Sequence, residues 1–409
     1  MYNTILVALD GSCWSDAAIE AAIELTGAQE NRPDGTKLIG CHVYAARMHR
    51  DRFQQMEPGL PQRYHEDGDR LDQLRGTHDS LISDGMKLIS DAYLAPLEKR
   101  AREKGLDYAG LSVQGRNYVE ILRVVRERGV DLLVMGAWGQ GRVVETQLGG
   151  VAERALLLAT ESDILLTKCD WALKNRAIVV GIDGSPFSYV ALERAATLGR
   201  AFGAPVEGVA VYDPFFHSGV FRSTTEALPK EAAERFNFPA QQLLHDEIID
   251  HGLERLYRRG LERAISHARE LGVEMCAEVL TGKVYPRLHQ YAREREAGLV
   301  VVGRWGLHRE PESPIGSNAL NLARLCATNT LVVGSSKVIR KGLEFTNEAV
   351  ETPKELSWTP EAEEQLRRIP FFVRRMARRA VENYVRERQL GVVTVEAVNE
   401  VARRFGMRK

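Results

Sequence analysis

The chain has 409 residues, of which 44% are hydrophobic and 27% are charged, and its formal net charge is −1. This length and balance predict two or three folded domains and exclude a wholly disordered chain. No apolar run reaches the ~20 residues that span a bilayer, no signal-peptide pattern opens the sequence, and the five cysteines lack CxxC spacing. We therefore expect a cytoplasmic protein without a membrane segment, a disulfide framework or a zinc ribbon.

Two motifs occur twice along the chain. The segment ILVALDGS at 5–12 recurs as IVVGIDGS at 178–185, and DLLVMGAWG at 131–139 recurs as GLVVVGRWG at 298–306. The two offsets differ by only a loop's length, so the repeating unit is a whole domain rather than a short solenoid repeat. The predicted regions are a first lobe at 1–172, a second lobe at 173–335, a linker at 336–357 and a small basic helical domain at 358–409.

Within each lobe, short apolar runs alternate with longer segments whose apolar residues recur at helical spacing. This alternation is typical of βα units and predicts an α/β fold of two tandem, doubly wound parallel sheets. The predicted strands are 4–9, 37–44, 107–113, 131–136 and 163–167, then 177–182, 205–211, 273–280, 298–302 and 329–333. The predicted helices are 14–26, 80–104, 117–128 and 150–159, then 187–202, 240–271, 284–296 and 317–326. The polar stretches 47–79 and 213–239 are predicted to be long loops or lids.

Glycines follow the fourth predicted strand of each lobe at matching spacing. Glycine lets the backbone come close to a ligand, and the free N–H groups at the start of the next helix suit a phosphate. The first-lobe set is Gly136, Gly139, Gly149 and Gly150, and the second-lobe set is Gly303, Gly306, Gly316 and Ser317. Turn formation alone would explain such a set in one lobe, but its recurrence in two lobes favours a binding site.

The first predicted strand of each lobe ends in an aspartate followed by Gly-Ser, at Asp10 and at Asp183. In open α/β sheets, ligands bind beyond the carboxyl ends of the strands. If strands one and four are neighbours, the aspartate and the glycine loop face one crevice. The carboxylate then suits a ribose hydroxyl or a base amino group, while the loop holds phosphates.

This G-2x-G-9x-G-(S/T) spacing, the opening ILVALDGS and the apolar closing strands resemble the universal stress protein (UspA) family, here as a tandem pair over residues 1–335. The resemblance implies strand order 3-2-1-4-5 in each lobe. It implies bound ATP or AMP, with Mg²⁺ able to accompany ATP, because many members bind these nucleotides, and others, which lack the motif, do not. It also implies pairing at the edges of the last strands, which predicts an intramolecular pseudo-dimer of the lobes, with a homodimer as the alternative. The implied nucleotide contacts are Asp183, Gly303, Gly306, Gly316 and Ser317, and, in the first lobe, Asp10, Gly136, Gly139 and Gly149.

Both lobes depart from the family pattern. Gly150 replaces the Ser or Thr and retains only its backbone N–H, whereas the second-lobe loop places Glu310 and Glu312 where phosphates would lie. The cations that could offset those charges are Arg304, His308 and Arg309. The first-lobe loop is less acidic and offers Arg142. Motif completeness favours the second lobe and loop charge favours the first; on balance the sequence favours the second.

The sequence contains no Walker lysine, no nucleophile elbow and no metal-ligand cluster. The acidic, histidine-containing runs 65–67 and 245–251 are interpreted as solvated faces. Trp138 and Trp305 could stack on a base or pack against the sheet edge. If ATP is slowly hydrolysed, or if its terminal phosphoryl group is transferred to the protein with release of ADP, as the resemblance implies for some relatives, Ser317 is the candidate acceptor.

The end of the chain is basic and the rest is acidic. Residues 360–409 hold 12 Lys and Arg against 7 Asp and Glu, a charge of +5, so the preceding 359 residues carry −6. Helical patterns fall at 360–367, 371–389 and 394–405. An apolar stripe is formed by Phe371, Phe372, Met376, Ala380 and Tyr384, and paired arginines by Arg374, Arg375, Arg378 and Arg379. This basic face is interpreted as solvated or docked on the acidic lobes.

Residues 358–406 resemble the small C-terminal domain of the B subunit of light-independent protochlorophyllide reductase. The resemblance is carried by Trp358, Glu361, Ala362, the segment 369–374 and Glu382. Residues 335–409 contain no cysteine that could hold a cluster, so reductase chemistry is not implied. An unidentified protein partner or a tetrapyrrole-related partner fits this domain better than nucleic acid, because the charge is modest and no recognition motif is present.

These features predict a protein that binds an adenine nucleotide and acts in a stress response through regulation or interaction. The alternatives are a slow ATPase or autophosphorylating enzyme, and a nucleotide-independent scaffold whose helical tail docks a partner.

Overall fold

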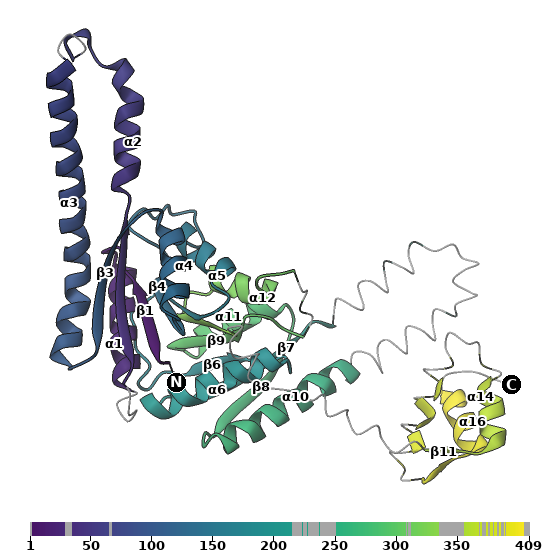
Figure 1. The fold of residues 1–409 in the computed structure, drawn as a ribbon. Coiled ribbons are helices and arrows are strands. Elements are labelled where there is room, and N and C mark those ends of the chain that lie inside the picture. The colour runs from purple at the N-terminus through teal and green to yellow at the C-terminus, as the bar shows by residue number, and fades with distance from the viewer. Residues whose placement is uncertain are drawn as a thin grey trace. The chain divides into compact units, whose positions relative to one another are not determined.

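The structure is a computed structural model. It describes residues 2–28, 35–64, 68–214, 251–307, 309, 312–334 and most of 356–404, together with positions 223, 227 and 237. The chain divides into two compact units, the first of residues 1–216 with 253–342 and the second of residues 217–252 with 343–409. Figure 1 labels the helices and strands.

Strands and helices alternate along the first lobe, as predicted. The strands are β1 (Thr4–Ala8), β2 (Lys37–Tyr44), β3 (Tyr108–Gln114), β4 (Leu132–Gly136) and β5 (Asp163–Thr167). The helices are α1 (Cys13–Gly27), α2 (Ala46–Met56), α3 (Gly68–Glu103), α4 (Asn117–Glu127) and α5 (Gly150–Leu158), with 3₁₀ turns η1 (Glu57–Gly59) and η2 (Gln62–Tyr64).

The second lobe repeats this order. Its strands are β6 (Ile178–Gly181), β7 (Val206–Tyr212), β8 (Met275–Thr281), β9 (Leu299–Gly303) and β10 (Thr330–Val333). Its helices are α6 (Pro186–Phe202), α10 (His251–Glu270), α11 (Val284–Glu294) and α12 (Ser317–Leu325). The predicted loop 213–239 lies almost entirely outside the described residues.

All ten strands form one sheet of order β3-β2-β1-β4-β5-β10-β9-β6-β7-β8. Each half has the expected 3-2-1-4-5 order with parallel pairing, so the predicted α/β fold is confirmed. The halves join where β5 and β10 pair antiparallel, with Leu165 opposite Leu331. The two lobes therefore form an intramolecular pseudo-dimer, and the edges at which separate chains would pair are both occupied.

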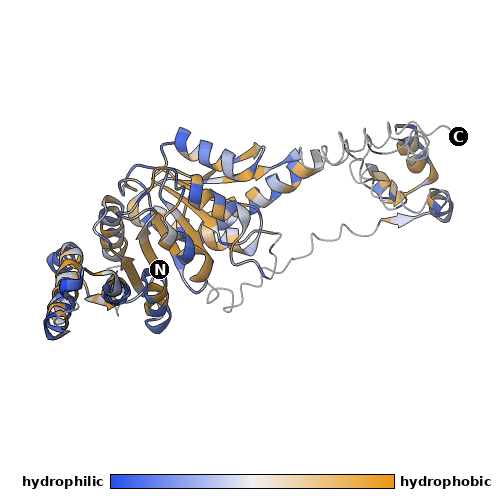
Figure 2. Ribbon diagram, turned by 90° about the horizontal axis from the view of Figure 1, so that it is seen from above, coloured by the Kyte–Doolittle hydropathy of each residue, from blue (hydrophilic) through white to orange (hydrophobic). Residues whose placement is uncertain are grey.

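The core consists of strands buried on both faces. Ile5, Leu6 and Val7 of β1 and Val300 and Val301 of β9 have no exposed surface. Figure 2 shows the apolar residues concentrated on the strands and on the inner sides of the covering helices. Continuous apolar strands of this kind belong to parallel sheets covered on both faces by helices.

Each lobe's first helix starts at a serine. The Oγ of Ser12 accepts the N–H of Ser15, and the Oγ of Ser185 accepts the N–H of Ser188, both at 3.2 Å. These side-chain caps satisfy amide groups that have no partner inside the helix. The Asp-Gly-Ser segments therefore start helices α1 and α6 immediately beyond strands β1 and β6.

The structure contradicts the prediction of a loop at 47–79. This stretch contains α2 and the first part of α3, which together form a helical hairpin that extends beyond the sheet (Figure 1). Helix α3 begins at Gly68, twelve residues before its predicted start at 80. The polar composition arises because most of the hairpin is exposed, so residues 68–79 present little of the apolar periodicity used to recognise helices.

The second unit contains a small module built around its own core. Strands β11 (Ser357–Trp358) and β12 (Val392–Val393) pair in parallel, and helices α14 (Pro360–Arg367) and α16 (Val395–Arg404) pack together. The core residues are Ala362, Val381, Val385, Val393, Ala397, Val398 and Val401. Phe371, Phe372 and Met376 of the predicted stripe, and the linker up to residue 355, lie outside the described residues.

No helix in the described part of the chain combines the length and apolar composition that a membrane span requires.

Candidate functional site

Asp10, just after β1, joins the glycine loop of the first lobe to the end of that strand by hydrogen bonds. Its Oδ1 accepts the backbone N–H of Ser12 at 3.0 Å, and its Oδ2 accepts the N–H of Gln140 at 3.1 Å. Strands β1 and β4 are neighbours, so the aspartate and the glycine loop face the same crevice. Each carboxylate oxygen accepts one of these bonds and retains capacity for a further donor.

Asp183 joins the glycine loop of the second lobe to the end of β6 in the same way. Its Oδ1 accepts the N–H of Ser185 at 2.9 Å, and its Oδ2 accepts the N–H of Leu307 at 3.1 Å. Strands β6 and β9 are neighbours as well. The two lobes thus share one backbone frame, which the repeated motif encodes.

The inner glycine of each loop lies against the aspartate. A Cβ on Gly139 would overlap the Oδ2 of Asp10, and a Cβ on Gly306 would lie 2.5 Å from the Oδ2 of Asp183. Real Cβ atoms essentially never approach so closely. At these positions glycine is required for the loop to reach the carboxylate.

The glycine at the end of the fourth strand is covered by the first turn of a helix. A Cβ on Gly136 would lie 2.8 Å from the Cβ of Trp14 in α1, and a Cβ on Gly303 would lie 2.8 Å from the Cβ of Phe187 in α6. These two glycines therefore allow close helix–strand packing, and they also line the two pockets, so their predicted contact with a nucleotide stays a prediction.

Helices α5 and α12 begin without a side-chain cap. Gly149 and Gly316 occupy their N-cap positions, where no side chain accepts an N–H. In contrast, Ser12 and Ser185 cap α1 and α6. The first amide groups of α5 and α12, like those of α4 and α11, therefore have no side-chain acceptor in their own sequence, and free amide groups at a helix start suit an anion.

The uncapped amide groups line the crevices. The first intrahelical bond of α5 runs from Glu153 N–H to Gly149 O at 2.9 Å, and residues 150–152 precede it and line the first pocket. In α12 the first bond runs from Leu320 N–H to Gly316 O at 3.0 Å, and residues 317–319 line the second pocket. Gly150 and Ser317 hold equivalent positions, as the motif spacing implies.

The loop tryptophans pack inside their own lobes. The indole N–H of Trp138 donates to Thr146 O at 3.0 Å, and its ring lies 5.6 Å from the ring of Trp14. The guanidinium of Arg142 covers Trp138 with its carbon 4.4 Å from the ring centroid. Of the two sequence interpretations, this geometry supports packing rather than stacking on a base.

The second-lobe loop repeats this packing. The indole N–H of Trp305 donates to Ser313 O at 2.8 Å, and Arg309 covers its ring at 4.4 Å. Arg309 is therefore present at the loop, as expected of a compensating cation. His308 and Glu310 lie outside the described residues.

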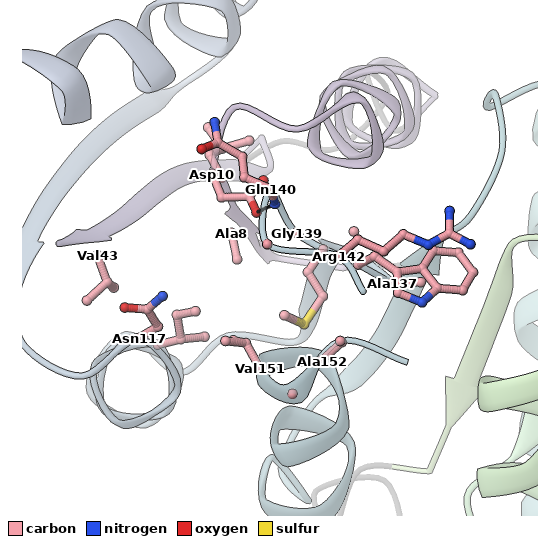
Figure 3. A pocket seen from close by; sticks show the side chains of 18 of the residues that line it. Ala8, Asp10, Val43, Asn117, Ala137, Gly139, Gln140, Arg142, Val151 and Ala152 are labelled. Atoms are coloured by element: carbon pink, nitrogen blue, oxygen red, sulfur yellow. Dashed lines mark hydrogen bonds between the residues drawn. The ribbon is translucent and has the colours of Figure 1, made fainter. Parts of the chain in front are cut away.

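The two pockets differ in size. The first has a volume of about 450 Å³ and the second about 290 Å³. Figure 3 shows the first pocket, with Asp10 and Gln140 on one side and Val151 and Ala152 at the start of α5 on the other. The first lobe therefore offers more room beside the same backbone frame.

The first pocket also has a polar wall. Tyr93, on α3, accepts a hydrogen bond from the side-chain amide of Gln140 at 2.8 Å, and its ring meets that of His42 edge-on with centroids 5.1 Å apart. The Nδ1 of His42 is buried, and no hydrogen-bond partner for it is found among the described residues. Burial lowers the pKa of His42, an effect that Asp10 partly opposes.

The second pocket lacks most of this wall. The strand registers place Ala210 where the first lobe has His42, and the loop places Leu307 where it has Gln140. Tyr257 of α10 lines the second pocket. The lobes thus share a backbone frame but differ in the side chains that face the crevice.

Arg304 is not available to balance phosphate charge, contrary to the sequence prediction. Its side chain is fully buried, and its guanidinium donates to the carbonyls of Leu156, Ala159 and Ser162 in the first lobe. It therefore covers the C-terminal end of α5 across the junction of the lobes. Burial lowers the pKa of Arg304 to about 10.

A lysine makes the reciprocal contact. The Nζ of Lys168, just after β5, donates to Cys326 O at 2.6 Å and to Leu322 O at 3.3 Å, at the end of α12. Burial lowers the pKa of Lys168 to about 8. Each lobe thus contributes one buried cation that stabilises the end of a helix in the other lobe.

Within the described residues, no group of His, Cys, Asp and Glu is arranged to hold a metal ion. The histidine-containing runs at 65–67 and 245–250 lie outside those residues.

The sequence profile of the universal stress protein family matches residues 1–166 and again residues 174–334. The chain belongs to the universal stress protein family. Universal stress protein YxiE of Bacillus subtilis is 28% identical over 160 residues, which cover 39% of this chain and 95% of YxiE. A putative universal stress protein of Pseudomonas aeruginosa superposes with a TM-score of 0.53 at 13% identity over 83% of this chain and 96% of its own, which shows a shared fold.

The C-terminal module matches a second family. The profile described as the proto-chlorophyllide reductase 57 kD subunit covers residues 358–401. The B subunit of light-independent protochlorophyllide reductase from Methylobacterium radiotolerans is 42% identical over 57 residues, 14% of this chain. The match spans only 11% of that relative, so this universal stress protein carries one small domain of it.

Two of the clustered arginines hold the C-terminal module together. Arg378 lies over the ring of Trp358 at 5.0 Å and donates to Glu382, which also accepts the indole N–H of Trp358. Arg374 donates to Ile369 O. These contacts lie within the module, so docking of the basic face on the acidic lobes stays a prediction.

His42, Tyr93 and Gln140 line the first pocket but were not predicted to be site residues. Gln140 directly follows a motif glycine and could have been found from that position. His42 and Tyr93 belong to a strand and a helix far from the motif, and only the parallel sheet brings their ends to one crevice.

Proposed function

We propose that this protein binds an adenine nucleotide in the pocket of its first lobe and acts as a regulator rather than as a rapidly turning-over enzyme. The observation that carries the proposal is the uncapped start of α5 beside the Asp10-held glycine loop, in the larger of the two pockets. ATP and AMP are the candidate ligands, and Mg²⁺ would accompany ATP.

In this proposal the phosphates lie at the start of α5. The amide groups of residues 150–152 supply hydrogen-bond donors, and the positive end of the helix dipole favours an anion there. Arg142 adds positive charge to the loop, although its guanidinium already stacks on Trp138. Gly150 contributes a backbone N–H without the hydroxyl that Ser317 offers in the second lobe.

The nucleoside part would occupy the polar wall. Asp10 retains acceptor capacity for a ribose hydroxyl or a base amino group. His42 and Tyr93 line the same pocket and are absent from the nucleotide motif. These side chains and the larger volume favour the first lobe, whereas motif completeness favours the second.

Equivalent substitutions in the two lobes test the proposal. In Gly150→Asp and Ser317→Asp, a carboxylate at the start of each helix is compatible with folding, because acidic residues there stabilise helices. A Cβ at Gly150 would meet only the flexible end of Arg154, at 3.3 Å. The same carboxylate would repel a phosphate held by these amides.

Calorimetric titration of the full chain with ATP and with AMP gives the readout. We expect G150D to weaken binding by at least about tenfold and S317D to change it less than about twofold. The opposite pattern would place the nucleotide in the second lobe. Absence of binding below about 1 mM in the wild-type protein would reject nucleotide binding and favour the scaffold alternative.

The enzyme alternative has its own readout. Release of phosphate from ATP at several turnovers per minute would favour an ATPase, and loss of any self-phosphorylation in Ser317→Ala would identify the acceptor. For the C-terminal module we propose a role in docking a protein partner. A partner that is recovered with the full chain should be lost when residues 356–409 are deleted.

A further inference from the structure

The helical hairpin of α2 and α3 is the least covered part of the first unit. Helix α3 has 36 residues, and its buried residues are Ser90, Leu94, Leu97 and Ala101, all in its C-terminal part. In α2 only Ala46 is buried. The hairpin projects past the ends of the strands (Figure 1). Residues 68–89 therefore form a helix of some six turns without one buried side chain.

Specific contacts hold the two helices of the hairpin together. The ring of Phe53 stacks on that of His78 with centroids 4.6 Å apart. Arg75 forms a two-pronged ion pair with Glu57, with N–O distances of 2.5 and 2.8 Å. At its base, α3 is joined to β3 by a hydrogen bond between Ser112 and Ser90. These contacts stabilise the hairpin, and no other described residues pack against one face of α3.

That face carries leucines at seven-residue spacing. Leu74, Leu81 and Leu88 are 44%, 68% and 70% exposed. Leucines at every seventh residue lie on one side of a helix, as one of the two core positions of a coiled-coil seam does. The intervening seam positions, four residues after each leucine, are held by His78, Gly85 and Ala92, of which His78 also stacks on Phe53.

We propose that this leucine face pairs with the same face of a second copy of the chain, antiparallel, so that two hairpins form a four-helix bundle. The pairing is isologous, with one patch meeting itself across a twofold axis. Two packed helices alone bury too little apolar surface for stable association, whereas the four-helix bundle is a stable architecture.

Steric and charge complementarity select the register. When His78 of one copy lies opposite Leu81 of the other, Leu74 faces Gly85 and Leu88 faces Leu71, so each seam leucine meets a small residue, another leucine or the ring of His78. On the flank, Asp91 of one copy then faces Arg70 of the other. Displacing the pairing by one heptad would instead bring Asp84 against Asp84, which like-charge repulsion disfavours.

The sheet topology explains why dimerisation would need a separate surface. Pairing of β5 with β10 uses both central edges within one chain. A second copy therefore cannot add at those strands. The hairpin supplies an alternative contact surface that the repeated motif does not encode.

The first test is the oligomeric state of the full chain by sedimentation. The wild type is expected to be a dimer at micromolar concentration. Leu81→Glu places a charge in the seam at a position that is exposed in the single chain, so the variant should fold, and it should weaken association by at least about 100-fold. Leu256→Glu, at a leucine 60% exposed on α10, is the matched control and should remain dimeric.

Circular dichroism confirms that each variant is folded. A monomeric wild type at 100 µM, or an L81E variant that dimerises as well as L256E, overturns the proposal.

Cysteine cross-linking tests the antiparallel orientation. Thr77 and Asp84 are both exposed and face each other across the proposed pair. A mixture of Thr77→Cys protein and Asp84→Cys protein should give a disulfide-linked dimer under mild oxidation, while neither variant alone exceeds the wild-type background from its own cysteines. Efficient cross-linking of each variant with itself would show parallel helices and overturn the proposed arrangement.

Discussion

Arg304 offers a direct test of how the two lobes are held together. Its guanidinium lies within the junction and donates to three backbone carbonyls of the first lobe: Leu156 at 2.5 Å, Ala159 at 3.1 Å and Ser162 at 3.3 Å. The Nε is buried and has no partner among the described residues. Replacement by Met retains much of the apolar stem and removes every one of these donors.

The expected loss of stability follows from the acceptors left behind. An unsatisfied buried carbonyl costs about 1–3 kcal/mol, so three would cost several times that amount. Removing a buried charge that has no hydrogen-bonded carboxylate returns part of this cost. We therefore expect Arg304→Met to lower the free energy of unfolding by about 3–5 kcal/mol.

A second arginine at the same junction serves as the control. Arg324 of α12 pairs with Glu153 of α5, and both side chains are about one-third exposed. Solvent screens such a pair, so Arg324→Met should cost at most about 1 kcal/mol. Arg304→Lys keeps a charge but not the planar fork, and should fall between the two.

Urea unfolding of the full chain, followed by circular dichroism, measures these differences. Because the lobes share one sheet, they are expected to unfold together, so a shift of the main transition reports on the junction. If R304M lies within about 1 kcal/mol of wild type, or loses no more stability than R324M, the helix-end contacts of Arg304 do not hold the lobes together.

Three further predictions concern the pocket and the junction. Gly139→Ala should weaken nucleotide binding at least about tenfold, because its Cβ would displace the carboxylate of Asp10, while Gly141→Ala, where nothing lies within 4 Å of the added atom, should bind normally in the same titration. Burial lowers the pKa of His42, so as the pH falls the imidazole takes up a proton more readily in the unfolded chain than in the folded one. The free energy of unfolding is therefore greatest above the ordinary histidine pKa and falls as the pH drops below about 6.5. His42→Ala should flatten that decline in thermal unfolding scans between pH 7 and 5, and an unchanged slope would show that His42 does not cause it. Lys168→Met should cost about 2–4 kcal/mol in urea unfolding, since two helix-end carbonyls lose their donor, and a neutral effect would show that water replaces the ammonium.

Much of this fold was predictable because its signals are local. A buried parallel strand is a continuous apolar run, and the repeat of ILVALDGS as IVVGIDGS reports a duplicated lobe without any knowledge of contacts. The carboxyl ends of the strands, Asp10 and Asp183, and the starts of α5 and α12 were located in the same way. The glycine spacing thus determined the backbone frame of both candidate sites.

Tertiary structure decided what depends on residues far apart in the sequence. The polar stretch at 47–79 forms helices because an exposed hairpin needs little apolar surface, which is also why hydrophobic periodicity could not reveal it. Nor could the glycine motif show that the guanidinium of Arg304 donates to carbonyls of the first lobe, or that His42 and Tyr93 line the first pocket.

The difference in volume between the two pockets depends on side chains that meet only when ten strands form one sheet. The same is true of the cations that donate to helix ends at the junction of the lobes. The sequence by itself determined two similar lobes with one shared loop geometry. The tertiary structure decided how the two pockets differ, because the side chains that surround each pocket come from segments far apart in the sequence.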